Sequence, residues 1–158
     1  MPTIGHLIYP YLIFTRQKVT ASCWTVLLAT SLLPDADIII SILATGSPWG
    51  LHRLFTHSLL FALLFLVAYG LLRRLELMFA FIGISSHILL DSLDAHGVPL
   101  LWPFSQQLFG LGLWASTDVR NLTIEGVLRP DSFIPDKILL AALLVYIIFQ
   151  HTIWREKR

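Results

Sequence analysis

Histidine and aspartate residues gather in short polar segments between long apolar runs. In one segment His87 and Asp91 stand four residues apart, so in a helix they lie on one face and a single cation could contact both. A second segment holds Asp35 and Asp37. Residues at this spacing point to different sides of a regular helix, and they converge only where the backbone opens, which Pro34 favours. Mixed His and Asp ligands suit zinc, and also manganese or iron.

A third polar segment, residues 52–58, contains two histidines and an arginine. Thr56 or Ser58 could cap the helix that follows. A histidine near the positive end of a helix is disfavoured as imidazolium, and the neutral ring is the form that a metal binds. Arg53 could hold an anionic substrate group through a bidentate contact, or extend to a lipid phosphate. A polar loop and a plain His–Asp hydrogen bond stay open as alternatives for these segments.

The remaining histidines are less certain members of a site. His96 precedes a glycine in a turn, and His6 reaches the others only if the N-terminal helix begins on their side of the membrane. His151 lies near the far end of the last apolar run, and we do not expect it in the site. The predicted metal ligands, enough for a two-metal site, are His6, Asp35, Asp37, His52, His57, His87, Asp91 and His96. The predicted catalytic residues are Asp35, Asp37 and Arg53.

The composition places these residues in a membrane protein. Hydrophobic residues make up 56% of the 158 residues and charged residues 13%, about half the charged share of a soluble domain. So few charges could not cover a soluble surface. A net charge of +1 argues against a nucleic-acid partner. Cys23 is the single cysteine, which excludes an internal disulfide and a cysteine-based zinc site.

The apolar runs predict an all-α fold, a polytopic membrane helix bundle in one membrane-embedded domain, 1–158. A bilayer core of about 30 Å needs about 20 helical residues. The expected spans are about 19–44, 57–72, 75–93 and 135–154, of which the second is short. The apolar stretch 4–14 is too short to cross and lacks a basic start, so it predicts a re-entrant or interfacial helix and not a signal peptide.

Basic residues set the expected orientation. In the four-span arrangement one side of the membrane holds Arg16, Lys18, Arg73, Arg74, Arg155, Lys157 and Arg158. The positive-inside rule makes that side cytoplasmic, together with the C-terminus. The polar segments from 35 to 96 then share the opposite side with an extracytoplasmic segment of about 94–134, whose aromatic residues include Trp102 and Trp114. We expect a multi-pass protein of a bacterial-type inner (plasma) membrane, with the site at its outer face.

With these residues identified, the chain resembles the YdjM-like family of membrane-bound metal-dependent hydrolases. The resemblance covers about 5–104, and the family often has glycine where this chain has Leu54. The matching stretches, in the family's order, are Gly5-His6-Leu7, Leu32-Leu33-Pro34-Asp35-Ala36-Asp37, His52-Arg53-Leu54-Phe55-Thr56-His57-Ser58-Leu59-Leu60, Ser86-His87-Ile88-Leu89-Leu90-Asp91 and Gly97-Val98-Pro99-Leu100-Leu101-Trp102-Pro103. The resemblance implies a membrane-bound hydrolase that depends on a metal.

A weaker resemblance is to the zinc-dependent phospholipase C superfamily. It rests on the order His, Asp, His, His-x-x-x-Asp, His along the chain. By that likeness the ligands would be His6, an aspartate of the Asp35/Asp37 pair, His52 or His57, His87, Asp91 and His96. The superfamily also uses a late His-x-x-x-Glu pair, which this chain lacks.

Three functions follow as hypotheses. In the leading one, a metal-activated water attacks a phosphoester of a lipid or lipid-linked substrate. The uncoordinated member of the Asp35/Asp37 pair is then the general base, and Arg53 holds the phosphate. The second is a metal or proton transporter, which needs ionisable groups deep in the membrane and toward its other face. The third is a non-catalytic membrane protein with a structural metal. The expected partner is membrane lipid.

Overall fold

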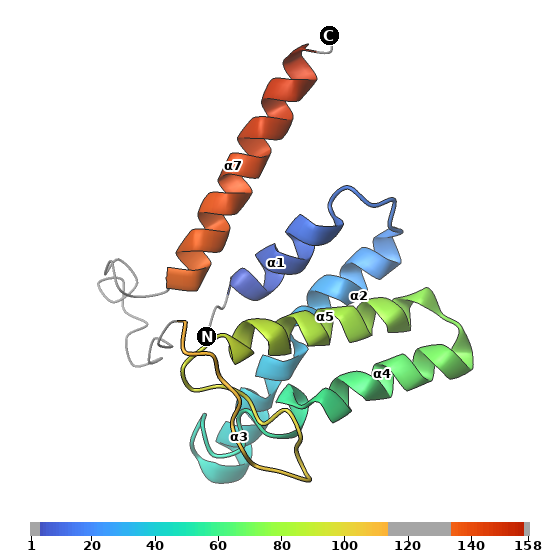
Figure 1. The fold of residues 1–158 in the computed structure, drawn as a ribbon. Coiled ribbons are helices and arrows are strands. Elements are labelled where there is room, and N and C mark those ends of the chain that lie inside the picture. Colours follow the sequence, from blue (N-terminus) through green and yellow to red (C-terminus); the bar gives the residue numbers. More distant parts are fainter. Residues whose placement is uncertain (1–3, 114–133, 157–158) are drawn as a thin grey trace.

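The computed structural model describes residues 4–113 and 134–156, and those residues form a helical protein without strands (Figure 1). A single pair of facing residues, Val98 and Phe109, makes an isolated antiparallel bridge. The all-α prediction is therefore confirmed for the described part of the chain. Residues 114–133 of the predicted extracytoplasmic segment lie outside it, as do the side chains of His151, Arg155, Lys157 and Arg158.

The first long helical unit runs over Ala21–Thr45 and is long and apolar enough to cross a membrane. It consists of α2 (Ala21–Leu32), a 3₁₀ turn η1 (Leu33–Ala36) and α3 (Asp37–Thr45). Thr20 caps its start, because its Oγ1 accepts the backbone N–H of Cys23 at 3.3 Å. Gly46 ends α3 in the left-handed region at φ 71°. Pro34, which cannot donate in the helix ladder, stands where the α-helix tightens into the 3₁₀ turn.

The second candidate span is α5 (Leu75–Ser92), which packs against both α2 and α4 (Leu59–Leu72). Close contact with α2 depends on Gly83, because a Cβ atom there would collide with the Thr30 hydroxyl and the Leu27 carbonyl. Small residues allow helices to approach closely in this way. Helix α4 has 14 residues, about 21 Å at 1.5 Å per residue, so it is shorter than a bilayer core.

Two helices flank this assembly. Helix α1 (Gly5–Phe14) has ten residues, as expected of a helix too short to span. Helix α7 (Ile134–Glu156) has 23 residues and runs beside α1 (Figure 1). The buried Asp136 of α7 accepts the backbone N–H of Gly5 through Oδ1 at 2.7 Å, and the Arg16 guanidinium lies 5.9 Å from the Tyr146 ring centre. The last helix therefore holds the start of the first.

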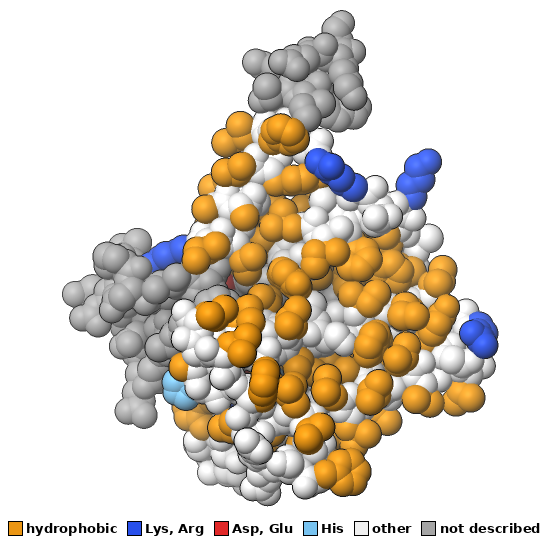
Figure 2. All heavy atoms as spheres, in the orientation of Figure 1, with side chains coloured by type: hydrophobic (Ala, Val, Ile, Leu, Met, Phe, Trp, Pro, Cys, Tyr) orange, Lys and Arg blue, Asp and Glu red, His pale blue; other side chains and the backbone are white. Residues whose placement is uncertain are grey.

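The surface agrees with a membrane location. Figure 2 shows apolar side chains over most of the visible face, with lysine and arginine near its margins. Leu43 of α3 is 82% exposed and Leu71 of α4 is 79% exposed, which would be costly in water. The small apolar core lies between α4, α5 and the loop after α5, and it contains Ala62, Ile84, Ile88 and Val98. Two helices of the described residues meet the length and composition of a span, where four were predicted.

Candidate metal centre

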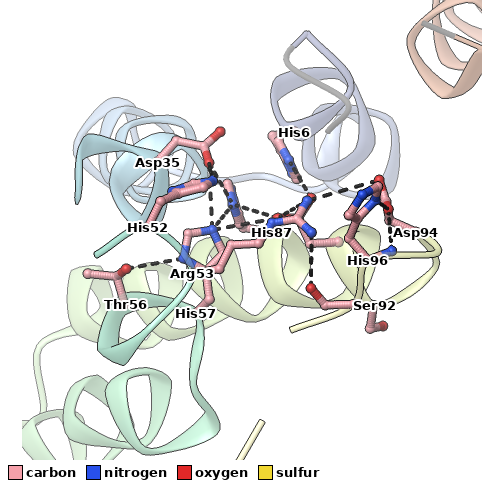
Figure 3. A network of polar contacts seen from close by, with 12 residues as sticks. His6, Asp35, His52, Arg53, Thr56, His57, His87, Ser92, Asp94 and His96 are labelled. Carbon is pink, nitrogen blue, oxygen red and sulfur yellow. Dashed lines mark hydrogen bonds and ion pairs between the residues drawn. The ribbon is translucent and has the colours of Figure 1, made fainter. Parts of the chain in front are cut away.

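Four side chains from three elements converge near α1: Asp35 of η1, His57 of the 3₁₀ turn η2 (Phe55–His57), and His87 and Asp91 of α5 (Figure 3). One donor atom of each lies within 4.8 Å of the other three. His57, His87 and Asp91 are fully buried, and the Asp35 side chain is 19% exposed. The structure therefore joins all three polar segments of the sequence at one point.

The spacing of these atoms suits a tetrahedral cation. Oδ1 of Asp35 lies 3.6 Å from Nε2 of His57 and 3.6 Å from Nε2 of His87. Oδ2 of Asp91 lies 3.5 Å and 3.7 Å from the same two nitrogens, which are 3.2 Å apart. Four ligands at about 2.0–2.2 Å from zinc in a tetrahedron are about 3.3–3.6 Å from one another. Five of the six distances between these four atoms are therefore close to those of a tetrahedral metal site.

The backbone explains why the two neighbouring aspartates take different positions. His87 and Asp91 share a helix face, as their spacing predicts. Asp35 lies inside the 3₁₀ turn, whereas Asp37 begins α3 on the far side of that turn. The Asp35 carboxylate reaches the centre, and the Asp37 carboxylate lies behind His52 and His57.

Asp37 contacts His52 and His57 at Nδ1, the ring nitrogen that faces away from the metal centre. Its Oδ1 accepts from Nδ1 of His52 at 2.6 Å, and its Oδ2 lies 3.4 Å from Nδ1 of His57. The same Oδ2 accepts from the Thr56 hydroxyl at 2.6 Å and from the Arg53 backbone N–H at 3.2 Å. A carboxylate only accepts hydrogen bonds, so Nδ1 of His52 carries a proton and its Nε2 keeps a lone pair. Asp37 therefore orients ligands, as carboxylates behind metal-binding histidines do.

His87 is oriented in the same manner. Its Nδ1 donates to the Ser31 carbonyl at 2.7 Å, which leaves the lone pair of Nε2 directed at the centre. Nδ1 of His57 lies 3.1 Å from the Thr56 hydroxyl, whose own proton goes to Asp37. Two lone-pair nitrogens only 3.2 Å apart would repel each other, and a cation between them removes that repulsion.

Two further histidines flank the four ligand atoms. Nε2 of His6 lies 3.5 Å from Oδ1 of Asp91, and the ring stacks on His87 at 3.7 Å. Nε2 of His52 lies 3.9 Å from Oδ1 of Asp35. Burial lowers the pKa of His6 to about 4, so its ring is neutral and able to bind a metal. The centre therefore has donors on two sides for a second cation.

Unpaired polar atoms mark the same point. Among the described residues, the buried atoms without a hydrogen-bond partner include Nδ1 and Nε2 of His6, Oδ1 of Asp35, Nε2 of His52, Nη2 of Arg53 and both carboxylate oxygens of Asp91. Buried polar atoms are nearly always paired, so this concentration of exceptions is consistent with a metal site. Charge agrees, because three carboxylates, of Asp35, Asp37 and Asp91, lie among the histidines of the centre, and the Arg53 guanidinium lies against Asp91 alone of the three.

Arg53 is turned inward and is not a lipid-facing side chain. Its backbone has φ 60°, and its side chain is 12% exposed. Nη1 donates to the Gly97 carbonyl at 3.0 Å, while Nη2 lies 3.5 Å from Oδ2 of Asp91 and 4.0 Å from Oδ2 of Asp94. The guanidinium therefore borders the centre beside Asp91.

The structure does not bring His96 into the cluster. Its side chain is 65% exposed, and its Nδ1 lies 3.2 Å from Oδ1 of Asp94. Sequence reasoning had overlooked Asp94, which is fully buried and accepts the His96 backbone N–H at 2.7 Å. Burial raises the pKa of this carboxyl, but the His96 N–H and the Arg53 charge outweigh burial and lower it. An Asp two residues before the bonded N–H, followed by Gly97, is the turn signal that could have identified it.

Comparison with known proteins adds the family. A sequence model described as YdjM inner membrane protein matches residues 1–157, so the chain belongs to that family. This confirms the resemblance found in the sequence and places the chain among inner membrane proteins. No curated protein and no solved structure matches the chain.

Proposed function

We propose that this member of the YdjM inner membrane protein family is a metal-dependent hydrolase with zinc at its centre, acting on a phosphoester of a lipid or lipid-linked substrate. The observation that supports it best is the set of four ligand atoms at tetrahedral spacing, from Asp35, His57, His87 and Asp91. Arg53 stands beside them, and its Nη2 lies 3.5 Å from Asp91 without a hydrogen bond among the described residues. Metal, anion clamp and oriented histidines are the parts that phosphoester hydrolysis requires.

A bound zinc would supply Lewis acidity and lower the pKa of water toward neutrality. We assign the proton transfer to His52, because its Nδ1 is held by Asp37 at 2.6 Å and its Nε2 faces Asp35 without a hydrogen-bond partner among the described residues. Asp37 then assists the base and is not itself the base, since its two oxygens already accept hydrogen bonds. This pairing of a carboxylate with a histidine follows the logic of general-base catalysis.

Arg53 is the anion clamp in this proposal. A guanidinium offers two parallel N–H donors that match a phosphate, and Nη2, which makes an ion pair but no hydrogen bond with Asp91, is the donor that would turn to the phosphate. Gly97 holds the other nitrogen and so limits the movement of the side chain. A transport function has less support, because α2 and α4 contain no charged residue that could continue a pathway across the membrane.

The membrane arrangement belongs to the same proposal. Helices α4 and α7 complete the four predicted spans, with α7 about 34 Å long at 1.5 Å per residue. The C-terminus then lies in the cytoplasm, and the metal centre faces outward. A cysteine placed after Arg158, in a Cys23→Ser background, should resist membrane-impermeant thiol reagents in intact cells. Ready labelling of that cysteine would reverse the orientation.

The test of catalysis combines metal analysis of the purified protein with hydrolysis assays on phospholipids and soluble phosphoesters. Arg53→Ala leaves the four ligand atoms in place, so metal content should persist. Loss of a charge-assisted phosphate contact costs about 1.5–3 kcal/mol, or about ten- to a hundredfold in kcat/KM. Glu76→Gln, at the other end of α5, is the matched control and should behave like wild type. A wild-type protein that binds metal but hydrolyses none of these substrates would favour a structural metal.

A further inference from the structure

The segment 97–113, which follows the metal centre along the chain, contains no charged residue and no histidine. It is not helical, yet it presents large apolar side chains outward: Leu101, Phe104, Leu108, Phe109, Leu111 and Leu113. Phe104 is 87% exposed. A run of this kind is rare on surfaces that face water and is typical of contact with protein or membrane.

Eight N–H groups of this segment donate to backbone carbonyls of the segment itself or of the end of α5. Val98 and Phe109 exchange two N–H···O bonds of 2.9 Å, and the N–H groups of Leu111 and Leu113 donate to carbonyls of Ser92 and Leu93. Within the segment, Trp102 donates to Pro99, and Phe104 and Ser105 donate to Leu101. Pro99 and Pro103 have no N–H to satisfy. Each such pair lowers the cost of placing irregular backbone in a low-dielectric environment.

The segment also continues the apolar surface of α4. A helix of 14 residues, about 21 Å long, falls short of a bilayer core of about 30 Å. Leu100 accepts the first N–H of α4, from Leu59, at 3.0 Å, and the Trp102 ring lies 5.5 Å from Phe55 of η2. Figure 1 shows the segment, yellow to orange, next to the start of α4. Segment 97–113 therefore lengthens the apolar surface of α4, which alone is too short to cross the bilayer core.

Finally, the segment is connected to the metal centre. Its first residue, Gly97, accepts the Arg53 guanidinium at 3.0 Å. Residues 100–109 of the segment line an open hollow of about 180 Å³. The lining residues are Leu100, Leu101, Ser105, Gln107, Leu108 and Phe109. Arg53 thus contacts the first residue of the segment, and the hollow lies along residues 100–109, so one stretch of chain connects an anion clamp with an apolar hollow, as the headgroup and acyl portions of a lipid would require.

We propose that the 97–113 segment lies in the bilayer and that its hollow takes part of an acyl chain, so that a lipid phosphoester enters the metal centre from the membrane and not from water. The entry of substrate rests on the proposed function. Contact of the segment with the bilayer does not, because it is argued from the exposed apolar side chains and their continuity with α4.

Membrane contact is tested without catalysis. In a Cys23→Ser background, a fluorophore on Phe104→Cys should be quenched by lipids with brominated acyl chains about as strongly as one on Leu43→Cys, an exposed position of α3. Gln17→Cys, exposed in the loop between α1 and α2, is the control in water and should be quenched at least threefold less. Quenching of Phe104→Cys at the level of Gln17→Cys would overturn the proposal.

Lipid entry is tested by a pair of variants. Phe104→Asp places a charge where we expect lipid and should lower the ratio of vesicle phospholipid hydrolysis to soluble phosphodiester hydrolysis at least tenfold. Phe104→Leu, which stays apolar, should keep that ratio. An unchanged ratio in Phe104→Asp contradicts lipid entry. If wild type hydrolyses neither substrate, the proposed function fails while the quenching result still decides membrane contact, including when Phe104→Asp does not fold.

Discussion

The atoms that face the metal centre and the groups that hold them from behind differ in kind. The facing atoms belong to buried histidines and carboxylates, and each has a lone pair or charge directed at one point. The groups behind them are a carbonyl at Ser31, a hydroxyl at Thr56 and the carboxylate of Asp37, and they contact only the far nitrogens of the rings. The first set determines whether a cation binds, and the second determines how tightly.

The largest effect is expected from Asp91→Ala. It removes a carboxylate whose two oxygens face the ligand nitrogens of His6, His57 and His87. We expect bound metal to fall below a tenth of the wild-type content, with activity lost in parallel, when both are measured on purified protein. Glu76→Gln changes a carboxylate of the same helix away from the centre and should keep its metal. A full metal content in Asp91→Ala would remove it from the ligand set.

A smaller loss is expected from Asp37→Asn. The amide keeps the volume but lacks the charge that holds His52 and His57. Groups behind the ligands typically contribute about 10–100-fold to metal affinity or activity, and competition with a chelator measures this directly. Thr56→Val removes one of the contacts of Asp37 and should cost less than Asp37→Asn. The reverse order would mean that Asp37 does not act through the histidines.

The contact between α7 and α1 should give a still smaller effect. Asp136→Ala removes the acceptor for the Gly5 N–H, a charge-assisted bond of about 1.5–3 kcal/mol. Helix α1 should loosen, with faster hydrogen exchange of its amides, and activity should fall about three- to tenfold because His6 shifts. Asp136→Asn retains an acceptor oxygen and should recover most of both readouts. Equal exchange rates in Asp136→Ala and wild type would exclude this positioning role.

The smallest effect is expected from His96→Ala. The side chain is mostly exposed and is not one of the four possible ligands Asp35, His57, His87 and Asp91. Metal content and kcat/KM should stay within about twofold of wild type, since surface substitutions away from such features change little. Metal loss in His96→Ala would show that the site extends to the turn after α5.

Local spacing accounts for what the sequence could reveal. His87 and Asp91 share a face because four residues make about one helical turn, and the hydropathy pattern predicted the helical runs that the structure describes at 21–45, 59–72, 75–92 and 134–156. The different positions of Asp35 and Asp37 depend on the 3₁₀ turn that contains Pro34. Whether the chain forms such a turn at a proline is decided by tertiary packing. The position of His6 depends on Asp136, which is 131 residues away from Gly5. Periodicity carries no information about a contact of that range.

The contact between Gly5 and Asp136 also sets the order in which parts of the protein can assemble during synthesis. Ribosomes deliver the N-terminus first, at about 5–20 residues per second, so residue 136 follows Gly5 by roughly 7–26 s. During this interval α1, with His6, lacks the partner that fixes its start. The start of α1 is therefore fixed late, after α7 has been made, and full metal uptake should follow synthesis instead of accompanying it. A chain that stops before α7 would lack the contact that fixes the start of α1.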